Sequence, residues 1–201
     1  DIAGGLQAVD SIPSALEAAK VALRIREGAF GPRHVFVALT LANIATMQGE
    51  MGELDAANEN LARAAAALEQ SGPAWDTRRA EILTNLGSVL TGLGEYPEAH
   101  RVLTRARDIT RVGPAPRDEL AAAIHTALGL LDRRMGDFET ASTMLEKALW
   151  LNRQIHRGNH PVGRHAPRQQ PSRAVHRARA AHAAAALRHD RRASPWIRNV
   201  W

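Results

Sequence analysis

The 201-residue chain contains no cysteine, so neither a disulfide nor thiolate chemistry is available to it. Only 4% of the residues are aromatic, so the interior must be built mainly from leucine, alanine, isoleucine and valine. No apolar run reaches the roughly 18–20 residues that span a bilayer. The N-terminal segment also lacks the basic start and long apolar middle of a signal peptide. We therefore predict no membrane association and a cytoplasmic location.

The motifs that usually mark an active site are missing as well. Gly92 and Gly94 open like a dinucleotide-binding fingerprint, but the third glycine is absent and the segment follows a predicted helix. The sequence has neither a phosphate-binding loop with Gly-Lys-Ser/Thr nor His-Glu-x-x-His, and no serine stands in a nucleophile elbow. We predict no enzymatic activity, no catalytic residue and no cofactor.

Histidine offers one candidate for a metal site. His156 and His160 are four residues apart, a spacing that can place two ligands on one helix face. Gly158 and Asn159 interrupt that segment and no carboxylate lies nearby in the sequence, so we predict no metal. His125 occupies a position equivalent to Leu41 and Leu83 in the internal repeat described below. We interpret it as a histidine tolerated at a partly exposed helix position.

What the sequence does contain is an internal repeat with a period of 42 residues. Large and small residues recur at this spacing, in what we call columns: Gly52, Gly94 and Gly136; Leu54, Tyr96 and Phe138; Ala57, Ala99 and Ala141; Leu61, Leu103 and Leu145; Ala64, Ala106 and Ala148. Self-similarity at a fixed period of this length is typical of solenoids, in which each unit contacts only its neighbours.

The best copy, residues 80–109, predicts two helices joined by a tight turn. Apolar residues at three- and four-residue steps give the first helix one buried face. Gly94 ends this helix, where a left-handed residue is favoured, and Pro97 suits the first turn of the second helix. Gly87 is small enough to let the two backbones approach closely, and Tyr96 then fills the space at the turn.

These residues resemble the tetratricopeptide repeat family. The large and small signature positions of the family match, in order, Leu83, Leu86, Gly87, Leu90, Ala99, Leu103 and Ala106. The usual unit has about 34 residues, and the longer period here resembles the kinesin-light-chain type that is common in bacterial multidomain proteins. The resemblance implies an all-α fold, a right-handed α-solenoid of antiparallel helix pairs.

The repeat predicts an array over residues 1–160. Three full units are expected at 35–72, 76–113 and 118–157, with Asp76 and Asp118 as helix N-caps. A truncated unit precedes them, because residues 1–10 match the end of a first helix and a second helix is expected from Pro13 to Arg26. Since the array begins in mid-repeat, we predict that the chain is a fragment of a larger bacterial protein.

The remaining residues, 161–201, form a tail rich in arginine, alanine, histidine and proline. Residues 156–201 contain ten arginines and one aspartate, a net charge of +9, whereas the whole chain carries +5. Such a segment can bind nucleic acid through its charge, it can be a disordered extension, or it can derive from a shifted reading frame of GC-rich DNA. The composition favours the second and third interpretations over nucleic-acid binding.

The family resemblance also implies a binding face. In that family, first-helix residues that point away from the packed seam contact extended peptides, often through an asparagine before the Leu-Gly pair. The positions here are Asn43, Thr46, Glu50, Thr84, Asn85, Ser88, Thr91, Thr126, Leu130, Arg133 and Arg134. A side-chain amide can donate to and accept from a peptide backbone, although the third unit has Ala127 in place of the asparagine. The alternative interpretation is that these are ordinary polar residues on an exposed helix face.

We therefore predict a protein–protein interaction scaffold that binds a peptide or partner protein in its concave groove. The alternative is a sensor or regulatory segment of a larger Ser/Thr kinase or signalling NTPase. Self-association is also expected, because neither end has the polar capping helix that end repeats need. Ile2, Leu6 and the apolar face of residues 145–151 would then be left open.

Overall fold

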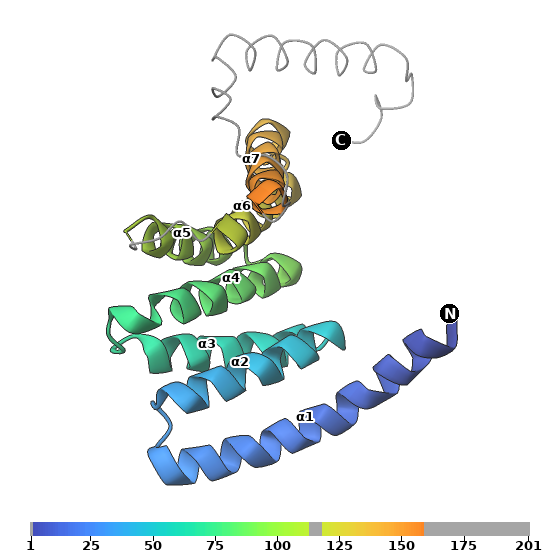
Figure 1. Ribbon diagram of the computed structural model, residues 1–201, viewed down its shortest axis with the longest axis vertical. Helices are drawn as coiled ribbons and strands as arrows, with labels where there is room; N and C mark the ends of the chain where they lie inside the picture. Colours follow the sequence, from blue (N-terminus) through green and yellow to red (C-terminus); the bar gives the residue numbers. More distant parts are fainter. Residues whose placement is uncertain (1, 113–117, 159–201) are drawn as a thin grey trace, which may run out of the picture. The chain divides into compact units, whose positions relative to one another are not determined.

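The computed structural model describes residues 2–112 and 118–158, and it describes the side chains at 12–111 and 119–155 (Figure 1). Helices account for most of these residues, and there is no strand among them. The elements are α1 (Ile2–Phe30), α2 (Val35–Glu50), α3 (Leu54–Leu68), the short 3-10 helix η1 (Pro73–Trp75), α4 (Asp76–Leu93), α5 (Tyr96–Val112), α6 (Asp118–Arg134) and α7 (Phe138–Gly158). The predicted all-α class is confirmed, while every prediction for residues 161–201 lies outside the described residues.

The helices pack as hairpins that follow one another in chain order. The three hairpins are α2–α3, α4–α5 and α6–α7, and α1 packs against α2. The second helix of one hairpin lies against the first helix of the next, α3 on α4 and α5 on α6, and α4 also contacts α2 and α6 (Figure 1). The extensive contacts are thus between neighbouring units, which confirms the predicted solenoid of helix pairs.

Each hairpin turn is made by a glycine of the same column. Gly52, Gly94 and Gly136 have φ values of 78°, 83° and 83°, in the left-handed region that glycine enters without steric cost. After Gly94, the amide of Glu95 donates to the carbonyl of Leu90 at 2.9 Å, and this bond closes the end of α4. The prediction that Gly94 ends the first helix is confirmed.

Glycine also permits the close approach of the two helices within a hairpin. A Cβ atom on Gly87 would lie only 2.4 Å from Cγ of Leu103, and one on Gly129 would lie 2.8 Å from Cγ of Leu145. Leu103 is 0% exposed, so it fills the space that the missing side chain leaves. The predicted role of Gly87 is therefore confirmed.

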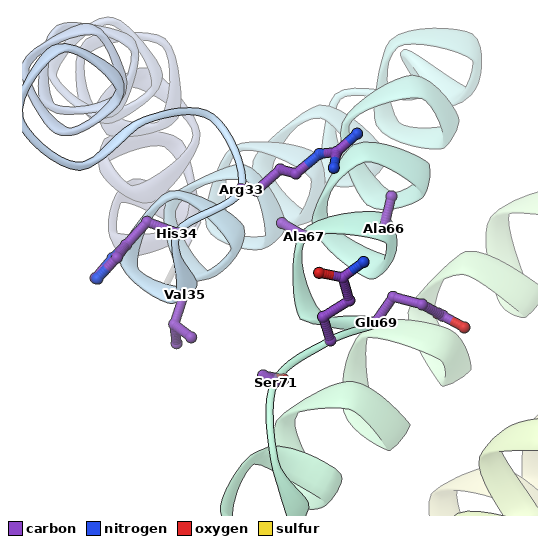
Figure 2. A pocket seen from close by; sticks show the side chains of 8 residues that line it. Arg33, His34, Val35, Ala66, Ala67, Glu69 and Ser71 are labelled. Carbon is purple, nitrogen blue, oxygen red and sulfur yellow. The ribbon is translucent and has the colours of Figure 1, made fainter.

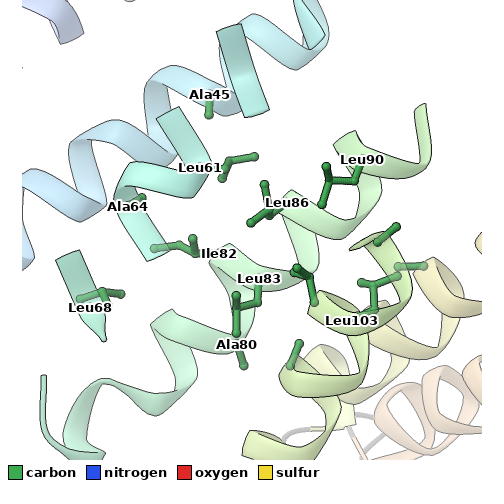
Figure 3. Close-up of a cluster of buried hydrophobic side chains, with 14 of the residues drawn as sticks. Ala45, Leu61, Ala64, Leu68, Ala80, Ile82, Leu83, Leu86, Leu90 and Leu103 are labelled. Carbon is green, nitrogen blue, oxygen red and sulfur yellow. The ribbon is translucent and has the colours of Figure 1, made fainter. Parts of the chain in front are cut away.

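The core is continuous from one hairpin to the next and consists mainly of leucine, isoleucine and alanine. Figure 3 shows Leu61 and Ala64 of α3 beside Ile82 and Leu86 of α4. Leu61 is 1% exposed, and full burial of a side chain of this size contributes about 1.5–3 kcal/mol. Such contacts between hairpins hold the stack together.

The N-terminal part differs from the prediction. Ile2–Phe30 is one continuous helix with Pro13 inside it, so the expected end of a first helix before Pro13 and the expected end of a second helix at Arg26 are both wrong. In the later units the chain turns at a glycine with positive φ, but the same column holds Asp10 here. Aspartate enters the left-handed region at a steric cost that glycine does not have, and here the helix continues.

The predicted N-cap role of Asp76 is also wrong. Asp76 is the first residue of α4, and its N-cap is Trp75, which makes no side-chain capping bond. The helix η1 leads directly into α4, so Asp76 already has helical backbone angles, φ −56° and ψ −36°. Its carboxylate instead accepts a hydrogen bond from Nη1 of Arg79 at 2.8 Å. Asp118 is likewise the first residue of α6.

Candidate peptide-binding face

The predicted binding residues lie on three helices that contact one another in series, α2, α4 and α6. We call the exposed members, together with the half-buried Thr126, the first-helix face: Asn43, Thr46, Glu50, Asn85, Ser88, Thr126, Leu130, Arg133 and Arg134. Nearly all of the predicted positions are therefore open to a partner. The face has one set of residues per unit, at the spacing of the repeat.

The two asparagines are the most suitable members for binding a peptide backbone. Asn43 and Asn85 occupy the same column on α2 and α4, and both side chains are exposed. Neither amide has a hydrogen-bond partner among the described residues. Each can therefore offer two donors and an acceptor to a ligand.

Two predicted members do not belong to this face. Thr84 and Thr91 on α4 are only 6% and 9% exposed. Their hydroxyls donate to the carbonyls four residues earlier, on Ala80 and Gly87, each at 2.7 Å. Because a threonine hydroxyl can be satisfied within its own helix, these residues turn inward. The expectation that they point away from the packed seam is wrong.

The other hydroxyl residues also bond to their own helices but remain accessible. Thr46 donates to the carbonyl of Ala42 at 3.0 Å, and Ser88 donates to that of Thr84 at 3.0 Å. Thr126 is half-buried and donates in the same way. An oxygen whose proton is already donated still accepts, so these groups favour ligands that present N–H donors.

The face changes character on α6. Leu130 is 39% exposed and stands in the column of Thr46 and Ser88. Arg133 and Arg134 are exposed, and no ion pair forms on either guanidinium within the described part of the chain. Arg134 shares its column with Glu50, so the charge of the face reverses between α2 and α6.

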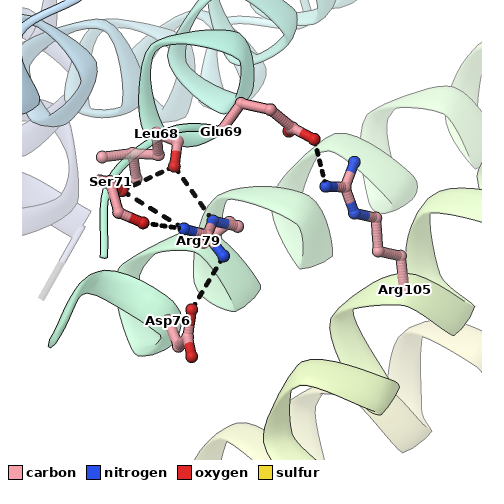
Figure 4. A network of polar contacts seen from close by, with 6 residues as sticks. All are labelled: Leu68, Glu69, Ser71, Asp76, Arg79 and Arg105. Carbon is pink, nitrogen blue, oxygen red and sulfur yellow. Dashed lines mark hydrogen bonds and ion pairs between the residues drawn. The ribbon is translucent and has the colours of Figure 1, made fainter. Parts of the chain in front are cut away.

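A row of ion pairs, which the sequence analysis did not find, links α1 to α3 and the end of α3 to α5. Glu27 Oε1 lies 2.7 Å from Nη2 of Arg63, and the next pair along, Glu69 and Arg105, has 2.5 Å between the corresponding atoms (Figure 4). Both pairs join residues 36 apart, in the same two columns. The pairing was visible in the sequence as glutamate and arginine repeating together every 42 residues. The next pair of positions holds Arg111 and Lys147, two residues of like charge.

Arg79 makes the densest polar network, shown in Figure 4. Its guanidinium donates to the carbonyls of Leu68 and Ser71 and to the carboxylate of Asp76. The carbonyl of Leu68 is one of the last four of α3, which have no partner within their own helix. Arg79 thus caps α3 from α4 and fixes the loop between them, and we assign it a structural role.

A cavity of about 480 Å³ lies between the α1–α2 linker and the end of α3 (Figure 2). Its lining is Arg33, His34, Val35, Ala66, Ala67, Glu69, Gln70 and Ser71. Nδ1 of His34 accepts a hydrogen bond from the amide of Phe36 at 3.2 Å, and its ring stacks on Phe30 at 4.6 Å. His34 is therefore the N-cap of α2, and contacts with Phe30 and Phe36 fix its ring, so we assign it a structural role.

Two polar residues of α6 lie in the interior. His125 is 6% exposed, so the expectation of a partly exposed histidine is wrong. Burial lowers the pKa of His125, and the hydrogen bond of Nδ1 with the carbonyl of Ala121 at 2.6 Å opposes this shift. Asp132 is also 6% exposed, and burial raises the pKa of its carboxyl, with a further contribution from the charge of Asp137.

Within the described residues, no group of three or more histidine, aspartate or glutamate side chains is placed to hold a metal ion. His160 of the predicted pair lies outside the described residues, and the side chain of His156 is not described either. None of the described helices is both long and apolar enough to span a membrane.

The fold and this face define a class of protein, a repeat array with an exposed polar face and a continuous aliphatic core. Residues 78–154 match the family model described as tetratricopeptide repeat. Residues 78–154 are thus similar to tetratricopeptide repeats, a family whose members generally mediate protein–protein interactions and are generally non-catalytic. A search of curated proteins found no match.

Two solved structures have a fold similar to that of this array. The structure of BtubC (BKLC) from P. vanneervenii superposes with a TM-score of 0.63 and 20% identity, over 82% of this chain and 65% of that one. The structure of the TPR-like repeats of a Podosopora anserina protein, described as a kinesin light chain, superposes with a TM-score of 0.58 and 17% identity. The match covers 75% of this chain and 72% of that one. The chain thus has the kinesin-light-chain-like repeat fold and spans about two thirds of the BtubC chain.

Proposed function

We propose that the chain is a protein-interaction module that binds an extended peptide segment along the first-helix face. The observation that carries this proposal is the pair of exposed amides on Asn43 and Asn85, which lie one repeat apart without partners among the described residues. A peptide backbone offers N–H and C=O groups at regular intervals, and each amide can pair with both. Ser88 and Thr46 supply further acceptors beside them.

The reversal of charge along the face supports a preferred direction for the ligand. Glu50 lies at the α2 end and Arg133 and Arg134 at the α6 end, so a peptide with opposite charges near its two ends fits in one orientation. A regulatory segment of a larger kinase or NTPase would use the same surface, so the proposal concerns the face and not the protein that carries it. A cytoplasmic location fits this role and stays a prediction.

Selection of peptides from a displayed random library on the full chain tests the proposal. Enriched peptides should bind the Asn43→Ala/Asn85→Ala variant at least about fivefold more weakly, because hydrogen bonds of about 0.5–1.5 kcal/mol each are lost at two sites. A matched control changes Glu59→Ala and Ser142→Ala, two exposed residues on second helices, and should bind within twofold. Failure to enrich any peptide, or equal binding by the asparagine variant, would contradict the proposal.

A further inference from the structure

The large apolar residues that remain exposed lie on α1 and on the first and last described hairpins, α2–α3 and α6–α7. They are Val21, Ile25, Phe30, Phe36, Met51, Leu130, Met135, Phe138, Leu149 and Trp150. None of them lies on α4 or α5, the central hairpin. Apolar surface exposed in this way often marks an interaction site.

On α7, three apolar residues are more exposed than the residues of the same columns in the earlier hairpins. Phe138 is 65% exposed, whereas Leu54 and Tyr96 in the same column are half-buried. Leu149 is 54% exposed and shares its column with the half-buried Ala65 and Arg107. In the third column, Leu61 and Leu103 are 1% and 0% exposed, whereas Leu145 is only half-buried. We call Phe138, Leu145 and Leu149 the end face.

The fold itself shows what covers these columns in the earlier hairpins. The first helix of the following unit lies across each second helix, α4 across α3 and α6 across α5. In Figure 3, Ile82 and Leu86 of α4 lie beside Leu61. At the turn, Leu54 approaches α4 so closely that a Cβ on Gly92 would be 3.1 Å from its Cδ1. Among the described helices, only α6 has an extensive interface with α7.

The end face is also more apolar than the covered surfaces that it copies. Leucine at 149 stands where α3 and α5 have alanine and arginine, and phenylalanine at 138 stands where they have leucine and tyrosine. The part of an apolar side chain that is exposed to solvent does not stabilise its own hairpin, but it contributes to binding once a partner covers it. The substitutions therefore favour a surface that a partner covers.

We propose that the end face binds an amphipathic α-helix of the first-helix type, presented by a partner polypeptide. Such a helix carries branched apolar residues four positions apart, as Ile82 and Leu86 are on α4. It lies across α7 as α4 lies across α3, and it covers Phe138, Leu145 and Leu149. This surface is distinct from the first-helix face, so the proposal does not depend on peptide binding there.

A labelled synthetic peptide with the sequence of residues 76–94 is a suitable probe, because this segment forms α4, a first helix that packs on α3 in the folded chain. Fluorescence anisotropy with the full chain should show saturable binding. Leu149→Glu and Phe138→Ser should each weaken binding at least tenfold. Since both positions are exposed, the melting temperature of each variant should stay unchanged.

Trp150→Glu is the matched control. Trp150 is 49% exposed, and the residues of its column, Ala66 and Asp108, are exposed even beneath a following helix. The Trp150→Glu variant should bind the 76–94 peptide with an affinity within twofold of that of the unaltered chain. A peptide with Ile82→Glu and Leu86→Glu should not bind the unaltered chain. The proposal fails if the original peptide does not bind, or if Leu149→Glu binds it equally. It also fails if sedimentation shows a dimer that Leu149→Glu dissociates, because the occupant is then a second copy.

Discussion

The central hairpin, α4–α5, and the last described hairpin, α6–α7, are built on the same columns but not with the same interior. Leu83 and Leu90 of α4 are buried, and their columns hold the buried residues His125 and Asp132 on α6. Leu103 is 0% exposed, whereas Leu145 in its column is half-buried. The backbone arrangement thus tolerates polar residues and an open face, and we expect the difference to lie in stability rather than in fold.

The largest expected difference between the hairpins comes from truncating their shared leucine. Leu103→Ala should lower the free energy of unfolding by about 2–5 kcal/mol, because it leaves a cavity in a closed core. Leu145→Ala should cost roughly half as much, because water already reaches that side chain. Urea unfolding of both variants measures this, and equal losses would contradict the comparison.

The glycines opposite these leucines sharpen the comparison. Gly87→Ala would force its Cβ against Leu103 and should cost about 1–3 kcal/mol, offset in part by the better helix propensity of alanine. Gly129→Ala should cost less, because Leu145 has room to move. In the double variant Gly87→Ala/Leu103→Ala the overlap is gone, so the two losses should not add. Additive losses in thermal melts would argue against the close approach.

The buried histidine should make the last hairpin sensitive to acid. The pKa of His125 is lowered in the folded chain from an ordinary value of 6.5, so below pH 6.5 the unfolded chain takes up a proton first. Stability should therefore fall as the pH drops through 6.5 and towards the lowered pKa, and it should be unaffected above 6.5. His125→Leu should remove this dependence in urea titrations at pH 8 and pH 5. If the stability of the His125→Leu variant falls between pH 8 and pH 5 as much as that of the unaltered chain, other titratable groups are responsible.

The smallest effect is expected from the row of ion pairs. Arg105→Ala breaks the pair with Glu69 and should cost up to about 1 kcal/mol, since both side chains are largely exposed. Lys147→Glu would place opposite charges at the next pair of positions and should stabilise by a similar or smaller amount. Both effects should shrink at high salt in thermal melts, and salt-independent changes would rule out an electrostatic origin.

Most of the hairpin architecture could be predicted because it depends on residue size and on glycine. The 42-residue columns place Gly94 at a left-handed turn and Gly87 against Leu103, and both features follow from sterics alone. The same reasoning fails at Pro13, where a second helix was expected to start because Pro13 shares the column of Pro97. The turn in the other units depends on glycine, and the corresponding residue is Asp10.

The binding face was predicted less completely, because exposure depends on packing between units. Asn43 and Asn85 are exposed as expected, but Thr84 and Thr91 turn inward and bond to their own helix. A threonine satisfies its hydroxyl in either environment, so its identity does not reveal its direction. His125 was placed at the surface for a similar reason, since the bond to the carbonyl of Ala121 that permits its burial is local and leaves no mark in the pattern.

Hydrogen exchange followed by mass spectrometry on the full chain tests the central claim most directly, namely that equivalent hairpins differ in stability because of their interiors and their neighbours. The account predicts slower amide exchange in α4 and α5, which are covered on both sides, than in α6 and α7. Uniform protection across both hairpins, or slower exchange in α6–α7, would contradict it.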